Sequence, residues 1–92
     1  HRESYGAKEI FRNEKNGKGT VIWSANGKKC KYIAIFNTDT KARKIKADLT
    51  GILMPDEQYS LYDIWQKSNV GKCKNSITAE VEPHGAKLYR IY

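Results

Sequence analysis

Apolar and polar residues alternate with a period of two along most of the chain. This period is typical of β-strands that bury one face, and no segment sustains the 3.6-residue spacing of an amphipathic helix. Short strands separated by Gly, Asn and Pro turns indicate an all-β domain, either an antiparallel sandwich or a barrel. The pattern predicts seven strands, at residues 7–14, 20–25, 31–37, 43–49, 58–65, 76–81 and 86–91.

The segment 31–37 is the most apolar of these runs. Its even positions, from Tyr32 to Phe36, share one face, and Ile33 and Ile35 share the other. Since both sets are apolar, we predict a central strand that is covered on both sides.

The turns are predicted from residues that tolerate unusual backbone angles. Asn16-Gly17 and Asn26-Gly27 have the chemistry of two-residue hairpin loops. Residues 68–71 are predicted as a further turn. Pro83-His84-Gly85 predicts a corner, in which Pro fixes φ, Gly admits positive φ and the His84 imidazole hydrogen-bonds across the turn.

The length of 92 residues allows one domain, residues 1–92, with one core. No apolar run approaches the roughly 20 residues of a membrane helix, so we expect no membrane partner. The N-terminus lacks the apolar core of a signal peptide. The chain is therefore expected to be either cytoplasmic or a piece of a longer protein.

The net charge of +7 is concentrated between Lys28 and Lys46, where seven basic residues accompany one acidic residue. Such a segment indicates either a site for nucleic acid or the solvated faces and edges of strands. We favour solvated faces, because Tyr32 and Phe36 alternate with isoleucines rather than with lysines, whereas single-strand-binding surfaces interleave aromatic and basic residues. Nucleic acid is therefore not an expected partner.

Carboxylate and metal-ligand combinations do not assemble into a catalytic pattern. Glu80 and Glu82 share one strand face, whereas the two acids of a glycosidase flank a bond from opposite sides. Cys30, Cys73, His84 and His1 have none of the spacings of a zinc site. We therefore predict no catalytic residue, no cofactor and no metal site.

Five side chains carry structural predictions. Trp23 and Trp65 are predicted to fill the space between the sheets rather than to form exposed platforms for sugars. Asp63 is predicted to accept hydrogen bonds at a sheet end, because a buried carboxylate needs partners. The sequence leaves the redox state of Cys30 and Cys73 open, and we predict free thiols rather than a bridge.

The C-terminal run carries the most specific resemblance. It contains Tyr62-Asp63-Ile64-Trp65, a turn with Gly71, the strand 77–81, the Pro83-His84-Gly85 corner and Leu88-Tyr89-Arg90-Ile91. In this order the run resembles the end of family 27 glycoside hydrolases, the α-galactosidases and α-N-acetylgalactosaminidases. Val21-Ile22-Trp23 and the strand 32–37 are similar to two further strands of that family, so the resemblance spans about residues 19–92.

The resemblance implies a C-terminal β-sandwich of two antiparallel sheets, with seven to eight strands and Greek-key-like connections. In such enzymes a preceding (β/α)8 barrel carries the catalytic aspartates. None of that barrel fits here, so no catalytic residue is carried over. Residues 1–16 match only loosely and are either part of the sandwich or part of the connection from a barrel. The resemblance also implies a secreted or periplasmic parent protein.

Three function hypotheses follow. The first is a non-catalytic accessory β-sandwich of an α-galactosidase-like enzyme, with the barrel of the same chain as its partner. The second is a carbohydrate-binding module, since 11% of the residues are aromatic. The third, a nucleic-acid-binding barrel, rests on the basic segment alone.

Overall fold

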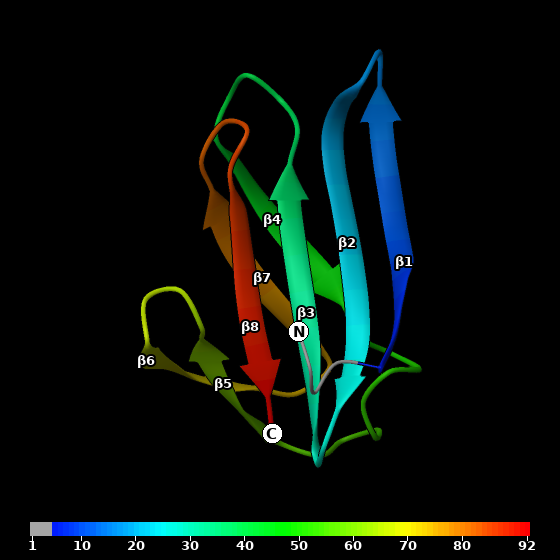
Figure 1. The fold of residues 1–92 in the computed structure, drawn as a ribbon, viewed down its shortest axis with the longest axis vertical. Coiled ribbons are helices and arrows are strands. Elements are labelled where there is room, and N and C mark those ends of the chain that lie inside the picture. Colours follow the sequence, from blue (N-terminus) through cyan, green and yellow to red (C-terminus); the bar gives the residue numbers. More distant parts are fainter. Residues whose placement is uncertain (1–4) are drawn as a thin grey trace.

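The structure, a computed structural model that describes residues 5–92, consists of β-strands joined by turns (Figure 1). The predicted fold class, a two-sheet antiparallel β-sandwich, is confirmed. Within the described residues no helix is long and apolar enough to cross a membrane. The strands are β1 (Tyr5–Lys15), β2 (Lys18–Gly27), β3 (Cys30–Asn37), β4 (Arg43–Asp48), β5 (Tyr59–Asp63), β6 (Ser68–Cys73), β7 (Ser76–Val81) and β8 (Ala86–Ile91).

The two sheets differ greatly in size. The larger has the order β1-β2-β3-β8-β5-β6, and the smaller consists of β4 and β7 (Figure 1). The chain passes to the small sheet after β3 and again after β6, so β8 returns to lie between β3 and β5. The small sheet therefore covers only part of the inner face of the large one.

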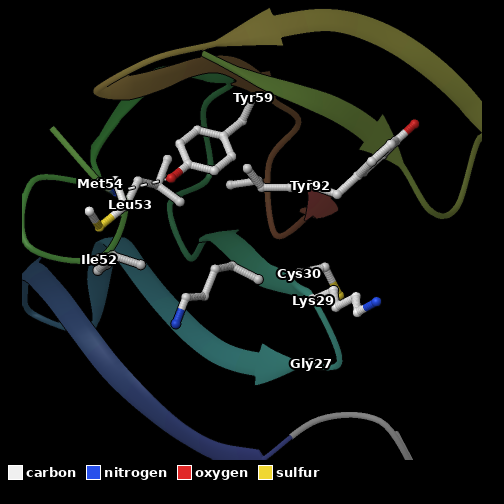
Figure 2. Close-up of a pocket in the computed structure, with 10 residues that line it drawn as sticks. Gly27, Lys29, Cys30, Ile52, Leu53, Met54, Tyr59 and Tyr92 are labelled. Carbon is white, nitrogen blue, oxygen red and sulfur yellow. Dashed lines mark hydrogen bonds between the residues drawn. The ribbon is translucent and has the colours of Figure 1, made fainter. Parts of the chain in front are cut away.

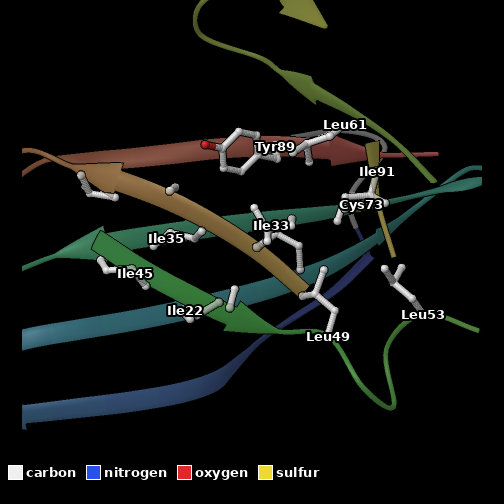
Figure 3. Close-up of a cluster of buried hydrophobic side chains, with 14 residues drawn as sticks. Ile22, Ile33, Ile35, Ile45, Leu49, Leu53, Leu61, Cys73, Tyr89 and Ile91 are labelled. Atoms are coloured by element: carbon white, nitrogen blue, oxygen red, sulfur yellow. The ribbon is translucent and has the colours of Figure 1, made fainter. Parts of the chain in front are cut away.

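The core lies between the two sheets, where their inward-facing side chains meet (Figure 3). Because alternate residues of each strand point inward, the period of two in the sequence becomes one continuous apolar layer. It contains Ile22, Ile33, Ile35, Ile45, Ala47, Leu49, Leu53, Leu61, Cys73, Ile77, Ala79, Val81, Tyr89 and Ile91.

Strand β3 is central in the large sheet, as predicted, because it pairs with β2 on one side and with β8 on the other. Ile33 and Ile35 are fully buried against the small sheet. The prediction that β3 is covered on both sides is wrong at Phe36, which is 37% exposed. Among the described residues, no strand layer covers the outer face of the large sheet.

Asn37 joins the end of β3 to the small sheet. The two hydrogens of its side-chain Nδ2 are shared among three carbonyl oxygens, those of Lys41 at 2.8 Å, Val81 at 2.9 Å and Glu82 at 3.1 Å. Its Oδ1 accepts from the Asp39 N–H at 3.0 Å. The side chain is 1% exposed, so it satisfies carbonyl groups that would otherwise be buried without partners.

Two of the three predicted tight turns lie elsewhere. Asn16-Gly17 does form the two-residue loop between β1 and β2, with φ of 55° and 74°. Asn26-Gly27 instead remains in β2, since Gly27 pairs with Cys30 and the turn falls on Lys28-Lys29. A side chain at Gly27 would lie 2.5 Å from the Tyr32 ring, so close packing explains this glycine.

Residues 68–71, predicted as a turn, belong to strand β6. The turn between β5 and β6 lies at residues 64–67, where Asp63 Oδ1 accepts the Gln66 N–H at 3.0 Å and Lys67 has a φ of 53°. Asp63, the last residue of β5, therefore starts the turn, because aspartate side chains readily accept a nearby backbone N–H. The prediction placed the turn at Gly71 instead.

The corner before β8 forms, but with different contacts from those predicted. Positive φ falls on His84, at 54°, rather than on Gly85. The main-chain N–H of Gly85, not the His84 imidazole, donates across the corner to the Glu82 carbonyl at 2.9 Å. The main-chain N–H of His84 donates instead to the Asp39 carbonyl in the loop after β3, at 3.1 Å. Gly85 is required by space, because a Cβ there would lie 3.0 Å from the Glu82 carbonyl oxygen.

Strand β1 forms one edge of the large sheet and pairs with β2 along its length, with two register shifts. Arg12 bridges Glu9 and Glu14 on it. Bulges and charges of this kind discourage an edge strand from pairing with another chain. Whether residues 1–16 also continue a connection from a barrel stays a prediction, and His1 lies outside the described residues.

Candidate binding surfaces

The two tryptophans lie at the surface. Trp23 is 39% exposed on the outer face of β2, and Trp65 is 58% exposed in the turn between β5 and β6. The prediction that they fill the space between the sheets is wrong. The isoleucines of the opposite face of β2 and β3 fill it instead, so the exposed rings are available as contact surfaces.

The outer face of the large sheet is apolar across three neighbouring strands. Trp23, Ala34 and Leu88 lie directly opposite one another on β2, β3 and β8, and Val21 lies opposite Phe36 on the antiparallel pair β2 and β3. We call these five residues the apolar outer face. Three of them, Trp23, Ala34 and Leu88, help to line a shallow hollow of about 170 Å³.

The outer face of the small sheet is polar. Lys44 lies opposite Glu80, and Lys46 lies opposite Thr78, and all four are exposed. Glu80 and Glu82 face solvent, as predicted, at a polar cleft that Lys87 also lines. The two outer surfaces of the sandwich therefore differ sharply in chemistry.

Asp63 is 2% exposed at the end of β5, where it accepts a backbone hydrogen bond as predicted. Lys87 Nζ lies 4.0 Å from its second carboxylate oxygen. Burial raises the pKa of the Tyr89 hydroxyl, and the negative charge of Asp63 raises it further. Asp63 is thus a structural carboxylate that joins β5, the following turn and β8.

The basic segment does not form a single patch. Lys28, Lys29 and Lys31 lie at the start of β3, whereas Lys41 and Arg43 follow its other end. A strand of this length separates the two groups by roughly 25 Å. Arg43 is also paired with Asp39 at 3.0 Å. The pKa of the Asp39 carboxyl is lowered, first by the hydrogen bond from the Thr40 N–H and then by the one from Arg43.

Cys30 and Cys73 are buried free thiols, and the described residues contain no group of three or more His, Cys, Asp or Glu side chains that could hold a metal ion. Burial raises the pKa of the Cys73 thiol. We therefore expect a disulfide reagent at pH 8 to react with native Cys73 more slowly than with an exposed thiol, because burial limits access to the sulfur and leaves less of it as thiolate. After denaturation both thiols should titrate, and a chain with no free sulfhydryl would contradict this.

A groove of about 410 Å³ lies at the end of the sandwich where the β2–β3 hairpin, the loop after β4 and the C-terminus meet (Figure 2). Tyr59 stands between Met54 and Tyr92, across from Gly27 and Lys29 (Figure 2). The Tyr59 hydroxyl accepts the Met54 N–H at 3.1 Å. Three segments that are distant in sequence therefore line one groove, which the sequence did not predict.

Comparison with solved structures shows the same fold in larger proteins. A GH27 β-L-arabinopyranosidase from Geobacillus stearothermophilus matches with a TM-score of 0.83 and 24% identity, over 97% of this chain and 20% of that chain. α-Galactosidase I from Mortierella vinacea matches at 0.80 and 22%, over 92% and 22%. The α-galactosidase of Saccharomyces cerevisiae, solved with raffinose, matches at 0.77 and 12%, over 94% and 32%.

The chain thus spans about a fifth to a third of the length of these solved structures. A search of curated proteins found no match. The family model described as the alpha galactosidase C-terminal beta sandwich domain matches residues 17–91. The chain therefore belongs to the family of α-galactosidase C-terminal β-sandwich domains.

Proposed function

We propose that this chain is a non-catalytic accessory domain of a glycoside hydrolase, docked on the catalytic barrel of the same polypeptide through its apolar outer face. The observation that supports this most directly is the contrast between the two outer surfaces. Trp23, Phe36 and Leu88 expose apolar surface on one side, whereas lysines and glutamates cover the other. Exposed apolar patches of this kind mark contact sites with other proteins or domains.

The class of enzyme follows from the family and its solved members. The similar structures are an arabinopyranosidase and two α-galactosidases, and this domain forms a minor part of each chain. By the same resemblance we propose a secreted or periplasmic parent protein. The domain itself would contribute stability and shape beside the barrel rather than a reacting group.

Loss of the outer-face rings should uncouple the domain from the barrel. In the complete polypeptide that carries this domain, we expect Trp23→Ser with Phe36→Ser to lower the melting temperature or to split one transition into two. Burial of each ring at the interface is worth about 2 kcal/mol. The matched control is Lys44→Ser with Lys46→Ser on the opposite surface, which should leave the melting curve unchanged. Differential scanning calorimetry measures both.

A footprinting experiment tests the docking face directly. Hydroxyl radicals should modify Trp23 and Phe36 more slowly in the complete polypeptide than in the 92-residue chain, while Met54, which is 66% exposed in the groove, should react equally in both. Equal reactivity of Trp23 in the two proteins would overturn the proposed docking face. An unchanged melting curve and activity after removal of residues 5–91 would overturn the accessory role itself.

A further inference from the structure

The groove beside Tyr59 has the dimensions and lining of a small-ligand site. Its volume of about 410 Å³ falls within the roughly 300–1,000 Å³ that ligand pockets occupy. Its floor and walls are mainly apolar, from Ile52, Leu53, Met54 and Ile91, with polar groups at the rim. It lies at the end of the sandwich and shares no lining residue with the apolar outer face.

Two tyrosines at the groove, Tyr59 and Tyr92, are held in place by hydrogen bonds. Tyr59 is fixed through its hydroxyl, which accepts the Met54 N–H. Tyr92 donates its hydroxyl to Asn69 Oδ1 at 3.0 Å, and the Arg90 guanidinium lies 4.6 Å from the centre of its ring. Main-chain hydrogen bonds between Tyr92 and Ser60 continue the sheet to this point. Little conformational freedom would be lost when a ligand contacts the Tyr59 ring.

The positive charge of the side chains that line the groove favours an anionic ligand. Lys29 and Lys31 line it, and among residues 5–92 no aspartate or glutamate side chain does. Lys31 Nζ is engaged by Asn26 Oδ1, whereas no hydrogen bond or ion pair occupies the Lys29 ammonium group among residues 5–92. Lys29 lies in the turn of the β2–β3 hairpin, with a φ of 60°, and is one of the residues that line the groove. A carboxylate at this position would gain a charge-assisted hydrogen bond.

We propose that this groove binds a uronate residue of an acidic polysaccharide, with its carboxylate on Lys29 and the apolar C–H face of its pyranose ring against Tyr59. The glycan class rests on the proposed function as part of a glycoside hydrolase. That the ligand carries a negative charge and has an apolar, ring-shaped body is inferred from the groove alone. The domain would then hold the enzyme on charged glycans through a site separate from its docking face.

Binding is measurable on the 92-residue chain by amide chemical shifts during titration with tetragalacturonate at low salt. We expect saturable shifts confined to the amides of Gly27, Lys29, Leu53 and Tyr59. Uncharged galactotetraose should bind about three- to tenfold more weakly, because it lacks the carboxylate. Lys29→Gln should weaken tetragalacturonate binding by a similar factor, and Lys29→Arg should restore it. Lys46→Gln, on the small sheet, is the matched control and should have no effect.

Three results would overturn the proposal. Equal losses from Lys29→Gln and Lys46→Gln would show non-specific attraction to a basic protein. Benzoate binding at the same amides as tightly as tetragalacturonate would show a carboxylate site without preference for sugars, and the absence of saturable shifts would show no site. Because the 92-residue chain contains no barrel, none of these results bears on the docking experiments, so the two proposals fail separately.

Discussion

Replacing Asn37 with aspartate is expected to destabilise this domain more than any other single isosteric change. The Asn37 amide shares its two hydrogens among three carbonyl oxygens at the junction of the two sheets, and a carboxylate can donate to none of them. The substitution would also bury a negative charge among carbonyl dipoles, since the side chain is 1% exposed. We expect a loss of about 3–5 kcal/mol in the free energy of unfolding at pH 7.

For a domain of this size, a loss of that order lowers Tm by roughly 15–30 °C. The introduced carboxyl should have a raised pKa in the folded state, because burial among carbonyl oxygens disfavours its charge. Its penalty is then complete above that raised pKa and fades as the pH falls toward the unfolded value of about 3.9. The Tm difference from the original chain should therefore shrink between pH 7 and pH 4.

Asn69→Asp provides the matched control for this experiment. Asn69 is exposed and uses only its Oδ1, as the acceptor of the Tyr92 hydroxyl, so a carboxylate can keep the contact. Its Tm should change by no more than a few degrees. A stable Asn37→Asp chain with a Tm difference that does not depend on pH would show that the amide is not the junction between the sheets.

The second large effect is expected from Ile33→Ala. Ile33 is fully buried on the central strand β3, where it faces the small sheet. Truncation removes apolar contacts from both layers and leaves a cavity that two paired sheets cannot readily close. We expect a loss of about 2–5 kcal/mol, whereas Ile33→Val should lose about 0.5–1.5 kcal/mol.

Urea unfolding of the 92-residue chain measures this prediction, with the midpoint shifting and the slope unchanged. Val70→Ala is the control, because Val70 is 47% exposed on the edge strand β6. That change should remain within about 0.5 kcal/mol. Similar losses for Ile33→Ala and Val70→Ala would mean that the two-sheet core does not dominate stability.

These predictions distinguish residues that stabilise the fold from residues that form the proposed contact surfaces. Ile33 and Asn37 join the sheets, so their substitution should alter stability whether or not a partner is present. The outer-face rings and Lys29 are exposed, so their substitution should alter docking or binding while the 92-residue chain keeps its fold.

Much of the fold could be predicted from the sequence because strand formation leaves a local signature. The alternation in the runs 20–25 and 31–37 correctly separates the inward isoleucines from the outward Trp23 and Phe36. Asn16-Gly17 forms the predicted loop because those residues adopt positive φ at little cost. Asp63 accepts the predicted backbone hydrogen bond because a buried carboxylate needs one.

The main errors have two causes. Alternation assigns residues to opposite faces of a strand, but it does not show whether a second layer covers each face. Trp23 and Phe36 were therefore predicted to be buried, although the two-stranded sheet lies on the other side. Gly27 and Gly71 were assigned to turns, although pairing register places both of them in strands.

By itself, then, the sequence determined that the fold is all-β, which residues share a face of each strand, and the family. All three depend on the local order of residues along the chain. Only the tertiary structure decided which face remains exposed, that Asn37 joins the sheets, and that residues 27–31, 52–59 and 91–92 meet in a groove. These features depend on contacts between segments far apart in sequence. Such contacts follow from how two layers of unequal size pack, which no local pattern encodes.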